Sequence, residues 1–161
     1  MDGDRSYSER FAAEYPSVLR TIRVIVGDGE VAREVTQEAF VQLFIHWRKV
    51  SGYDRPGAWV RRVAIRLAVR ERARAARLPM SGLDGGGEPA DGVASGLDLA
   101  QALRLLPACQ RAAIVLHYLD DLPVRAVADA LGCRESTAKV HLHRGRARLA
   151  ALLREESHDE H

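Results

Sequence analysis

The spacing of apolar residues predicts a chain built from helices. Apolar side chains recur every three or four residues over residues 9–26, again over about 30–50, and a third time over about 58–76. This period turns one face of each helix toward a core. Glycines on both sides of Asp28 and the Gly- and Pro-containing stretch 52–57 predict the breaks between these helices. No stretch alternates with the period of a β-strand, so we expect an all-α fold.

Shorter apolar stretches follow in the second half of the chain. Leucines ahead of Pro107 predict one short helix, and residues 109–118 predict the next. Helices over 123–131 and 136–153 flank Gly132, a residue type that lets a chain leave a helix in the left-handed conformation. The inward face of the last helix is expected to hold Ala138, Leu142, Gly145 and Leu149.

The stretch between the two halves differs in composition from both of them. Residues 78–97 contain six glycines, two prolines and three acidic residues, but no basic residue. This composition predicts a flexible linker over 78–96, and at full stretch the twenty residues 78–97 reach roughly 65 Å. We therefore expect two small helical domains, residues 1–77 and 97–161.

Basic residues gather in two blocks, although the formal net charge of the 161-residue chain is only +2. Seven arginines and one acid lie from Arg61 to Arg77, and six basic residues and one acid lie from Arg134 to Arg154. Arginine outnumbers lysine 22 to 2, and the planar guanidinium can bind phosphate or guanine through two hydrogen bonds. The two blocks indicate two nucleic-acid footprints.

The turn at Gly132 between two amphipathic helices predicts a helix–turn–helix. The second helix of this motif enters the major groove by its N-terminal half. Lys139 and Arg144 offer donors for phosphates and guanine edges there, and Val140 offers an apolar contact for a thymine methyl group. The candidate DNA-contacting residues are Arg134, Thr137, Lys139, Val140, His141 and Arg144. The alternative interpretation is an ordinary helical hairpin with a solvated charged face.

The sequence gives little indication of disulfides, metal binding or catalysis. Cys109 and Cys133 form no CxxC pair, which favours small buried residues over a disulfide or metal site and leaves any redox role open. His141 and His143 point to different sides of a helix, and no nucleophile–base arrangement or phosphate loop occurs. We expect no enzyme, cofactor or metal. No apolar run approaches the ~20 residues that span a membrane and no signal peptide begins the chain, which predicts a cytoplasmic protein without membrane contact.

Taken together, the motifs resemble those of the extracytoplasmic-function, or group four, sigma factors of bacterial RNA polymerase. In the second half, the similar stretches are LP at 106–107, QR at 110–111, VA at 127–128, LG at 131–132 and TAKVHLHRGR at 137–146. In the first half, they are EVTQEAF at 34–40 and WVRRVA at 59–64. The resemblance covers roughly residues 8–76 and 97–153.

The resemblance implies a subunit that binds polymerase core, directs it to promoters and promotes their melting. A helix surface for the β′ clamp would comprise Glu34, Gln37, Glu38 and Phe40, with core packing the alternative for Phe40. The −10 element would be bound by Trp59, Arg61, Arg62, Arg66, Arg70 and Arg74, with core packing the alternative for Trp59 and solvation for some arginines. The second domain would bind the −35 element. The implied partners are the β′ and β subunits of core, promoter DNA and, where one exists, an anti-sigma factor.

Several positions depart from the family pattern. Arg66 stands where asparagine is usual, and residues 140–141 replace a serine–arginine pair, so the promoter sequence stays undetermined. Arg134 replaces a capping serine, and we expect Ser136 or Thr137 to cap the helix instead. A stand-alone helix–turn–helix regulator, binding a palindrome as a dimer, is the main alternative. An adaptor without salt-sensitive DNA affinity is another.

Overall fold

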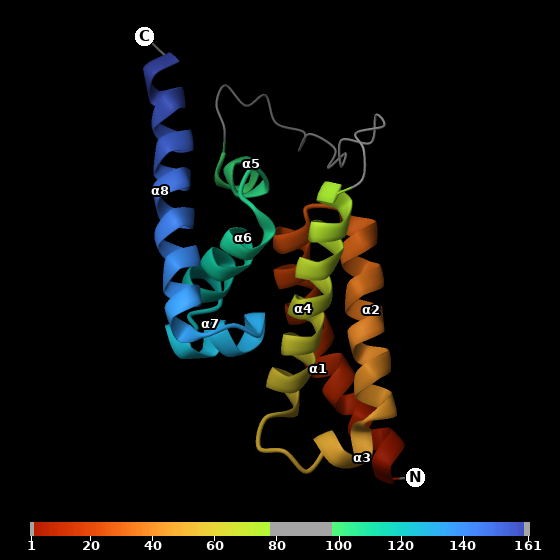
Figure 1. Ribbon diagram of the computed structural model, residues 1–161. Coiled ribbons are helices and arrows are strands. Elements are labelled where there is room, and N and C mark those ends of the chain that lie inside the picture. The colour runs from red at the N-terminus through yellow and green to blue at the C-terminus, as the bar shows by residue number, and fades with distance from the viewer. Residues whose placement is uncertain (1, 78–97, 160–161) are drawn as a thin grey trace.

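The computed structural model describes residues 2–77 and 98–159, and these ranges form helices joined by short connections (Figure 1). The helices are α1 (Asp2–Val26), α2 (Gly29–Ile45), α3 (Trp47–Val50), α4 (Pro56–Arg77), α5 (Leu99–Arg104), α6 (Ala108–Ile114), the π-helical η1 (Val115–Leu119), α7 (Val124–Leu131) and α8 (Glu135–Asp159). No strand occurs within the described ranges, and the all-α prediction is confirmed. The predicted linker, residues 78–96, lies outside them.

Helices α1, α2 and α4 lie side by side and form the first half of the molecule (Figure 1). Helix α1 begins seven residues earlier than predicted and continues through Pro16. Asp28 caps α2, because its carboxylate accepts hydrogen bonds from the backbone N–H groups of residues 30 and 31 at 2.9 and 3.2 Å. The single helix predicted over 30–50 is wrong. The backbone leaves the helix at His46, and α3 places Trp47 against the Tyr7 ring at 5.7 Å.

Helices α5 to α8 form the second half, which contains the predicted helix–turn–helix of α7 and α8. Gly132 has φ 71° and ψ 32°, the left-handed conformation that the sequence predicts. The helix predicted over 109–118 instead changes from α6 to the wider η1. Helix α8 already begins at Glu135, so the prediction that Ser136 or Thr137 caps it is wrong. The carbonyl of Arg134 accepts the first helical hydrogen bond, from the N–H of Ala138 at 3.0 Å.

The inward face of α8 is the one that the sequence predicts. Ala138, Leu142, Gly145 and Leu149 are all buried. Gly145 allows α6 and α8 to approach closely, because a Cβ atom there would lie 2.9 Å from Cγ1 of Ile114.

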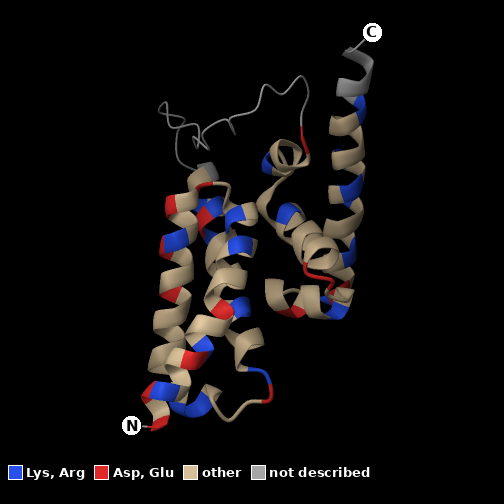
Figure 2. Cartoon of the chain, turned by 180° about the vertical axis from the view of Figure 1, so that it is seen from behind, with Lys and Arg blue, Asp and Glu red and all other residues tan. Residues whose placement is uncertain are grey.

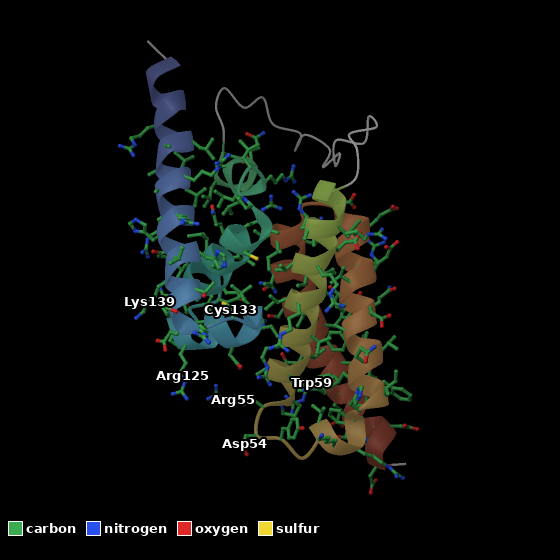
Figure 3. All side chains as sticks on the ribbon, in the orientation of Figure 1. Asp54, Arg55, Trp59, Arg125, Cys133 and Lys139 are labelled. Carbon is green, nitrogen blue, oxygen red and sulfur yellow. The ribbon has the colours of Figure 1, made fainter. Side chains whose placement is uncertain are left out.

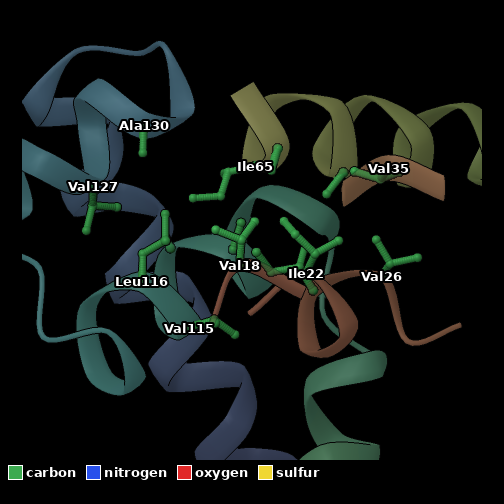
Figure 4. Packing of buried hydrophobic residues seen from close by; sticks show 14 of the residues in the cluster. Val18, Ile22, Val26, Val35, Ile65, Val115, Leu116, Val127 and Ala130 are labelled. Carbon is green, nitrogen blue, oxygen red and sulfur yellow. The ribbon is translucent and has the colours of Figure 1, made fainter. Parts of the chain in front are cut away.

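The two halves share one apolar core. Val18 and Ile22 of α1 and Ile65 of α4 belong to the same buried cluster as Leu116 and Val127 from the second half (Figure 4). Such packing removes apolar surface of both halves from water and holds them together.

A buried arginine also joins the halves. Arg111 of α6 is fully buried, and its guanidinium donates to the carbonyls of Leu103 and Ile25 at 2.6 Å each, of Leu106 at 3.0 Å, and of Arg104. Ile25 belongs to α1, so this side chain spans the junction. Burial, and then the nearby positive charges of two other arginines, lower the pKa of Arg111 to about 10, which leaves it charged at neutral pH.

The described parts of the chain contain neither a membrane-spanning helix nor a metal-binding cluster. None of their helices is long and apolar enough to cross a membrane. Their His, Cys, Asp and Glu side chains form no group of three that could hold a metal ion.

Candidate nucleic-acid interface

The first half of α8 presents a cationic face to solvent. Arg134, Thr137, Lys139, Val140 and Arg144 are exposed, and His141 is half-buried. Lys139 points away from the body of the molecule (Figure 3). Within the described residues, Lys139 and Arg144 make no hydrogen bond or ion pair. Buried Ala138 and Leu142 hold the opposite side of the helix against the protein, so these cations are free to meet a phosphate or a base edge.

Two neighbours give this face a mixed chemistry. Val140 exposes 44% of its surface, which is an apolar group placed among cations. Desolvation, and then the positive charge of Arg144, lower the pKa of His141. Its imidazole is therefore neutral at neutral pH and offers one donor and one acceptor.

Arg61, near the start of α4, lies partly buried where α4 and α1 meet the second half of the protein. Arg61 donates from Nη1 to Asp120 Oδ2 at 2.6 Å and to Thr21 Oγ1 at 3.1 Å, and from Nη2 to Ser17 Oγ at 2.5 Å. Basic residues recur along α4 at the junction of the halves, and along α8 (Figure 2). The two basic blocks of the sequence therefore have different surroundings.

Two more α4 arginines reach a single residue of α7. Arg62 Nη1 donates to Asp129 Oδ2 at 2.7 Å, and Arg66 Nη2 donates to the backbone carbonyl of Asp129 at 2.9 Å. Asp129 lies in the last turn of α7, where the helix dipole presents negative partial charge. Arg66, the departure from the family pattern, thus binds the end of the first helix of the helix–turn–helix.

The other residues predicted to bind the −10 element lie elsewhere. Arg70 is exposed, and Arg74 pairs with Glu71 at 3.6 Å one turn away. Trp59 is half-buried against the core, with its ring 5.7 Å from that of His46. The six predicted residues therefore do not form one continuous open surface here.

The predicted polymerase-binding residues of α2 separate by burial. Glu34, Gln37 and Glu38 are exposed along one side of the helix. Phe40 is 1% exposed, and its ring packs on that of Phe11 at 4.9 Å. In the folded chain Phe40 lies in the core, as the alternative interpretation predicts.

Three apolar residues extend that exposed side of α2. Val41, Phe44 and Ile45 expose 50, 57 and 64% of their surface. The apolar period over 30–50 predicts that Phe44 packs in the core, but the residue is more than half exposed, with its ring against the Tyr7 ring at 5.2 Å. Their spacing in the sequence could have located them, because Val41 follows Glu38 by three residues, and Phe44 and Ile45 follow Val41 by three and four. Apolar side chains gathered in this way mark a protein-binding surface.

The sequence of this chain matches two known protein families. Residues 11–78 match the family described as Sigma-70 region 2, and residues 96–149 match Sigma-70, region 4. The RNA polymerase sigma-E factor of Streptomyces coelicolor is 28% identical over 154 residues, which cover 91% of this chain and 85% of the relative. The ECF RNA polymerase sigma factor SigW of Bacillus subtilis is 27% identical over 151 residues, covering 81% and 80%.

Solved structures share the fold. The sigma factor RpoE of Bartonella quintana, in complex with the anti-sigma factor NepR, superimposes with a TM-score of 0.68 at 19% identity and covers 93% of this chain and 98% of its own. The sigma factor SigJ of Mycobacterium tuberculosis gives a TM-score of 0.62 at 24% identity, covering 89% and 53%.

Proposed function

Because this chain belongs to the extracytoplasmic-function sigma factors, we propose that its exposed surfaces divide the tasks of transcription initiation. The matches to regions 2 and 4 identify a sigma factor rather than a stand-alone regulator. We assign core binding and the −10 element to residues 1–77, and the −35 element to residues 97–161. Residues 78–96 would connect them.

The observation that carries this assignment is the open cationic face of α8. We assign it to the major groove of the −35 duplex. Lys139 and Arg144 would bind phosphates or guanine, and Val140 would touch a thymine methyl group. Arg134, Thr137 and His141 would add polar contacts on either side of them.

We assign the arginines of α4 to the opened −10 strand. They lie along one helix and can follow the phosphates of a single strand, while the half-buried Trp59 ring would support an unpaired base at its exposed edge. A surface that binds the separated strand better than the duplex shifts the equilibrium toward melting. Sigma factors are in general DNA-binding initiation factors without catalysis. We therefore expect polymerase core to supply the chemistry, in the bacterial cytoplasm where its template lies.

We assign the exposed side of α2 to the polymerase β′ clamp. Glu34, Gln37 and Glu38 form its polar half, and Val41, Phe44 and Ile45 form its apolar end. Such a surface fits a partner helix that is basic at one end and apolar at the other. The three apolar residues take the place that the family resemblance assigns to Phe40.

An anti-sigma factor is a further expected partner. The structure of the similar RpoE contains one, NepR. We propose that a protein of that class would cover the apolar end of α2 or the face of α8, and so compete with polymerase or DNA.

The test combines the purified chain with bacterial core polymerase and genomic fragments from its source, followed by mapping of transcript 5′ ends. We expect new start sites that share two upstream motifs with fixed spacing. Core binding assayed in parallel separates the steps. A chain that neither binds core nor creates new starts would contradict the proposed function.

A further inference from the structure

A groove of about 480 Å³ lies between α4 and α7. Its wall on α4 is one face of the helix, because the lining side chains recur at intervals of three and four residues: Ala58, Arg61, Arg62 and Ile65. The wall on α7 has the same spacing and consists of Ala126, Asp129 and Ala130. Two helices that lie far apart in the sequence therefore form the groove together.

Small side chains keep this groove open. Ala58 and Ala126 stand in the two walls at positions where larger apolar residues would fill the space between the helices. Ile65 and Ala130, at 0 and 2% exposed, form its buried part and lie on neighbouring helices (Figure 4). Tyr53, which is 42% exposed, lines it as well. Pockets for small ligands have volumes of roughly 300–1,000 Å³ and mostly apolar walls, and this groove has both properties.

One cation at the groove has no counterion in the protein. Arg61 and Arg62 each bind a carboxylate, at 2.6 and 2.7 Å. Arg55, in the loop ahead of α4, is exposed and makes no hydrogen bond or ion pair with any described residue. Figure 3 shows Arg55 on the side of α7 and the neighbouring Asp54 directed away from α7. A free guanidinium therefore stands beside a groove whose other arginines are neutralised.

This arrangement favours a ligand with one negative group and a flat apolar body. A guanidinium binds a carboxylate through two parallel hydrogen bonds, and these are stronger than bonds between neutral groups. The alanine side chains of the two walls present no polar atom, so they fit an apolar body. The hydroxyl of Tyr53 adds a group that can donate or accept a hydrogen bond. The groove thus has the chemistry to bind a small amphipathic anion.

We propose that the groove between α4 and α7 is a binding site for a small amphipathic carboxylate. Arg55 binds the carboxylate, and the apolar body lies between Ala58 and Ala126. The proposal does not depend on the roles assigned above to the DNA- and polymerase-binding surfaces. Because both halves of the protein line the groove, a bound ligand contacts both and stabilises the folded chain by mass action.

The test uses 2-naphthoate as the probe, since it combines a flat apolar body with one carboxylate. The matched neutral ligand is its amide, 2-naphthamide. Isothermal titration calorimetry with the full chain measures Kd and stoichiometry. We expect one site with a Kd on the order of 1 mM for a ligand of this size. The amide should bind about tenfold more weakly, because it lacks the charge-assisted hydrogen bonds. At about 10 mM, the acid should raise the Tm by roughly 3 °C.

Two variants of the groove locate the site. A58F fills the groove from an exposed position, and A75F makes the same change at an exposed alanine of α4 outside it. R55Q removes the free guanidinium, and R33Q removes an exposed arginine of α2 that does not line the groove. We expect A58F to abolish saturable binding of the acid and R55Q to weaken it about tenfold. A75F and R33Q should bind it as the wild type does.

Several outcomes would overturn the proposal. The wild type must show saturable binding of the acid below about 10 mM, which is roughly ten times the expected Kd. Equal affinity for acid and amide would show that the groove does not select an anion. Wild-type affinity in A58F would show that the probe binds elsewhere. Circular dichroism verifies the helix content of A58F, and R55Q tests the same site without adding bulk to it.

Discussion

The basic faces of α4 and α8 look alike in the sequence but differ in the folded chain. Lys139 and Arg144 of α8 have no ion-pair or hydrogen-bond partner among the described residues, whereas Arg61 and Arg62 of α4 pair with carboxylates at 2.6 and 2.7 Å. A count of cations therefore locates a nucleic-acid footprint without saying whether it is open. Whether a cationic side chain is available to bind DNA depends on the acidic residues that the fold places beside it.

The largest expected effect tests whether the two halves fold as one unit. R111M removes the donor that four backbone carbonyls share, one of them in α1. Unsatisfied buried acceptors cost about 1–3 kcal/mol each, so we expect a loss of at least ~3 kcal/mol in the free energy of unfolding. Urea denaturation measures it, with R125M on the exposed side of α7 as the control. A loss below ~0.5 kcal/mol in R111M would show that Arg111 does not join the halves.

The open face is tested by K139Q/R144Q. Each lost base or phosphate contact costs about 1–3 kcal/mol, so promoter-dependent transcription should fall about 30-fold or more. The free energy of unfolding should change by less than ~0.5 kcal/mol, because neither side chain has a partner in the described structure. R148Q/R154Q removes the same charge from the far half of α8 and serves as the control. Unchanged transcription in K139Q/R144Q would refute the −35 assignment.

The occupied face should behave in the opposite way. R61Q breaks a half-buried network with Asp120, Thr21 and Ser17, and we expect it to cost about 1–2 kcal/mol in the free energy of unfolding. R144Q, at an exposed arginine, is the matched control and should leave the free energy of unfolding almost unchanged. If the two variants are equally stable, the contrast between α4 and α8 does not exist in solution.

The exposed side of α2, which carries no basic block, provides a further comparison with α4 and α8. F44S/I45S replaces apolar side chains that are 57 and 64% exposed, so the stability of the free chain should hardly change. Affinity for polymerase core should fall about tenfold, since burying such groups at an interface contributes roughly 1–2 kcal/mol. L105S, at a residue of the second half that is 51% exposed, controls for loss of surface apolarity. If F44S/I45S binds polymerase core with wild-type affinity, this end of α2 does not belong to the interface.

The smallest effect concerns pH at the open face. Because the pKa of His141 is lowered, its imidazole gains a proton only below the ordinary histidine value of about 6.5. DNA affinity should therefore rise a few-fold as the pH falls below that value, and this rise should be absent in H141Q but present in H143Q. Protonation is easier in the unfolded chain, so the contribution of His141 to stability is present above about pH 6.5 and is lost as the pH falls below it. Identical pH profiles in wild type and H141Q would contradict this role.

Local patterns in the sequence predicted most helices and the helix–turn–helix correctly. The period of apolar residues identified Ala138, Leu142 and Leu149 as inward-facing, and Gly132 marked the turn, because both depend only on neighbouring residues. The errors at His46 and at η1 have another cause. At these two places the neighbouring residues contact partners that lie far away in the chain: Trp47 packs on Tyr7, and Asp120, directly after η1, binds Arg61.

What the sequence by itself determined is the class of the protein and the identity of its basic faces, because these follow from residue types at fixed spacing. The burial of Phe40, the exposed apolar end of α2 and the pairing of Arg61, Arg62 and Arg66 with Asp120 and Asp129 were decided only by the tertiary structure. Asp129 lies 67 residues from Arg62 in the chain. Coulomb attraction depends on separation in space, and no local pattern encodes that separation.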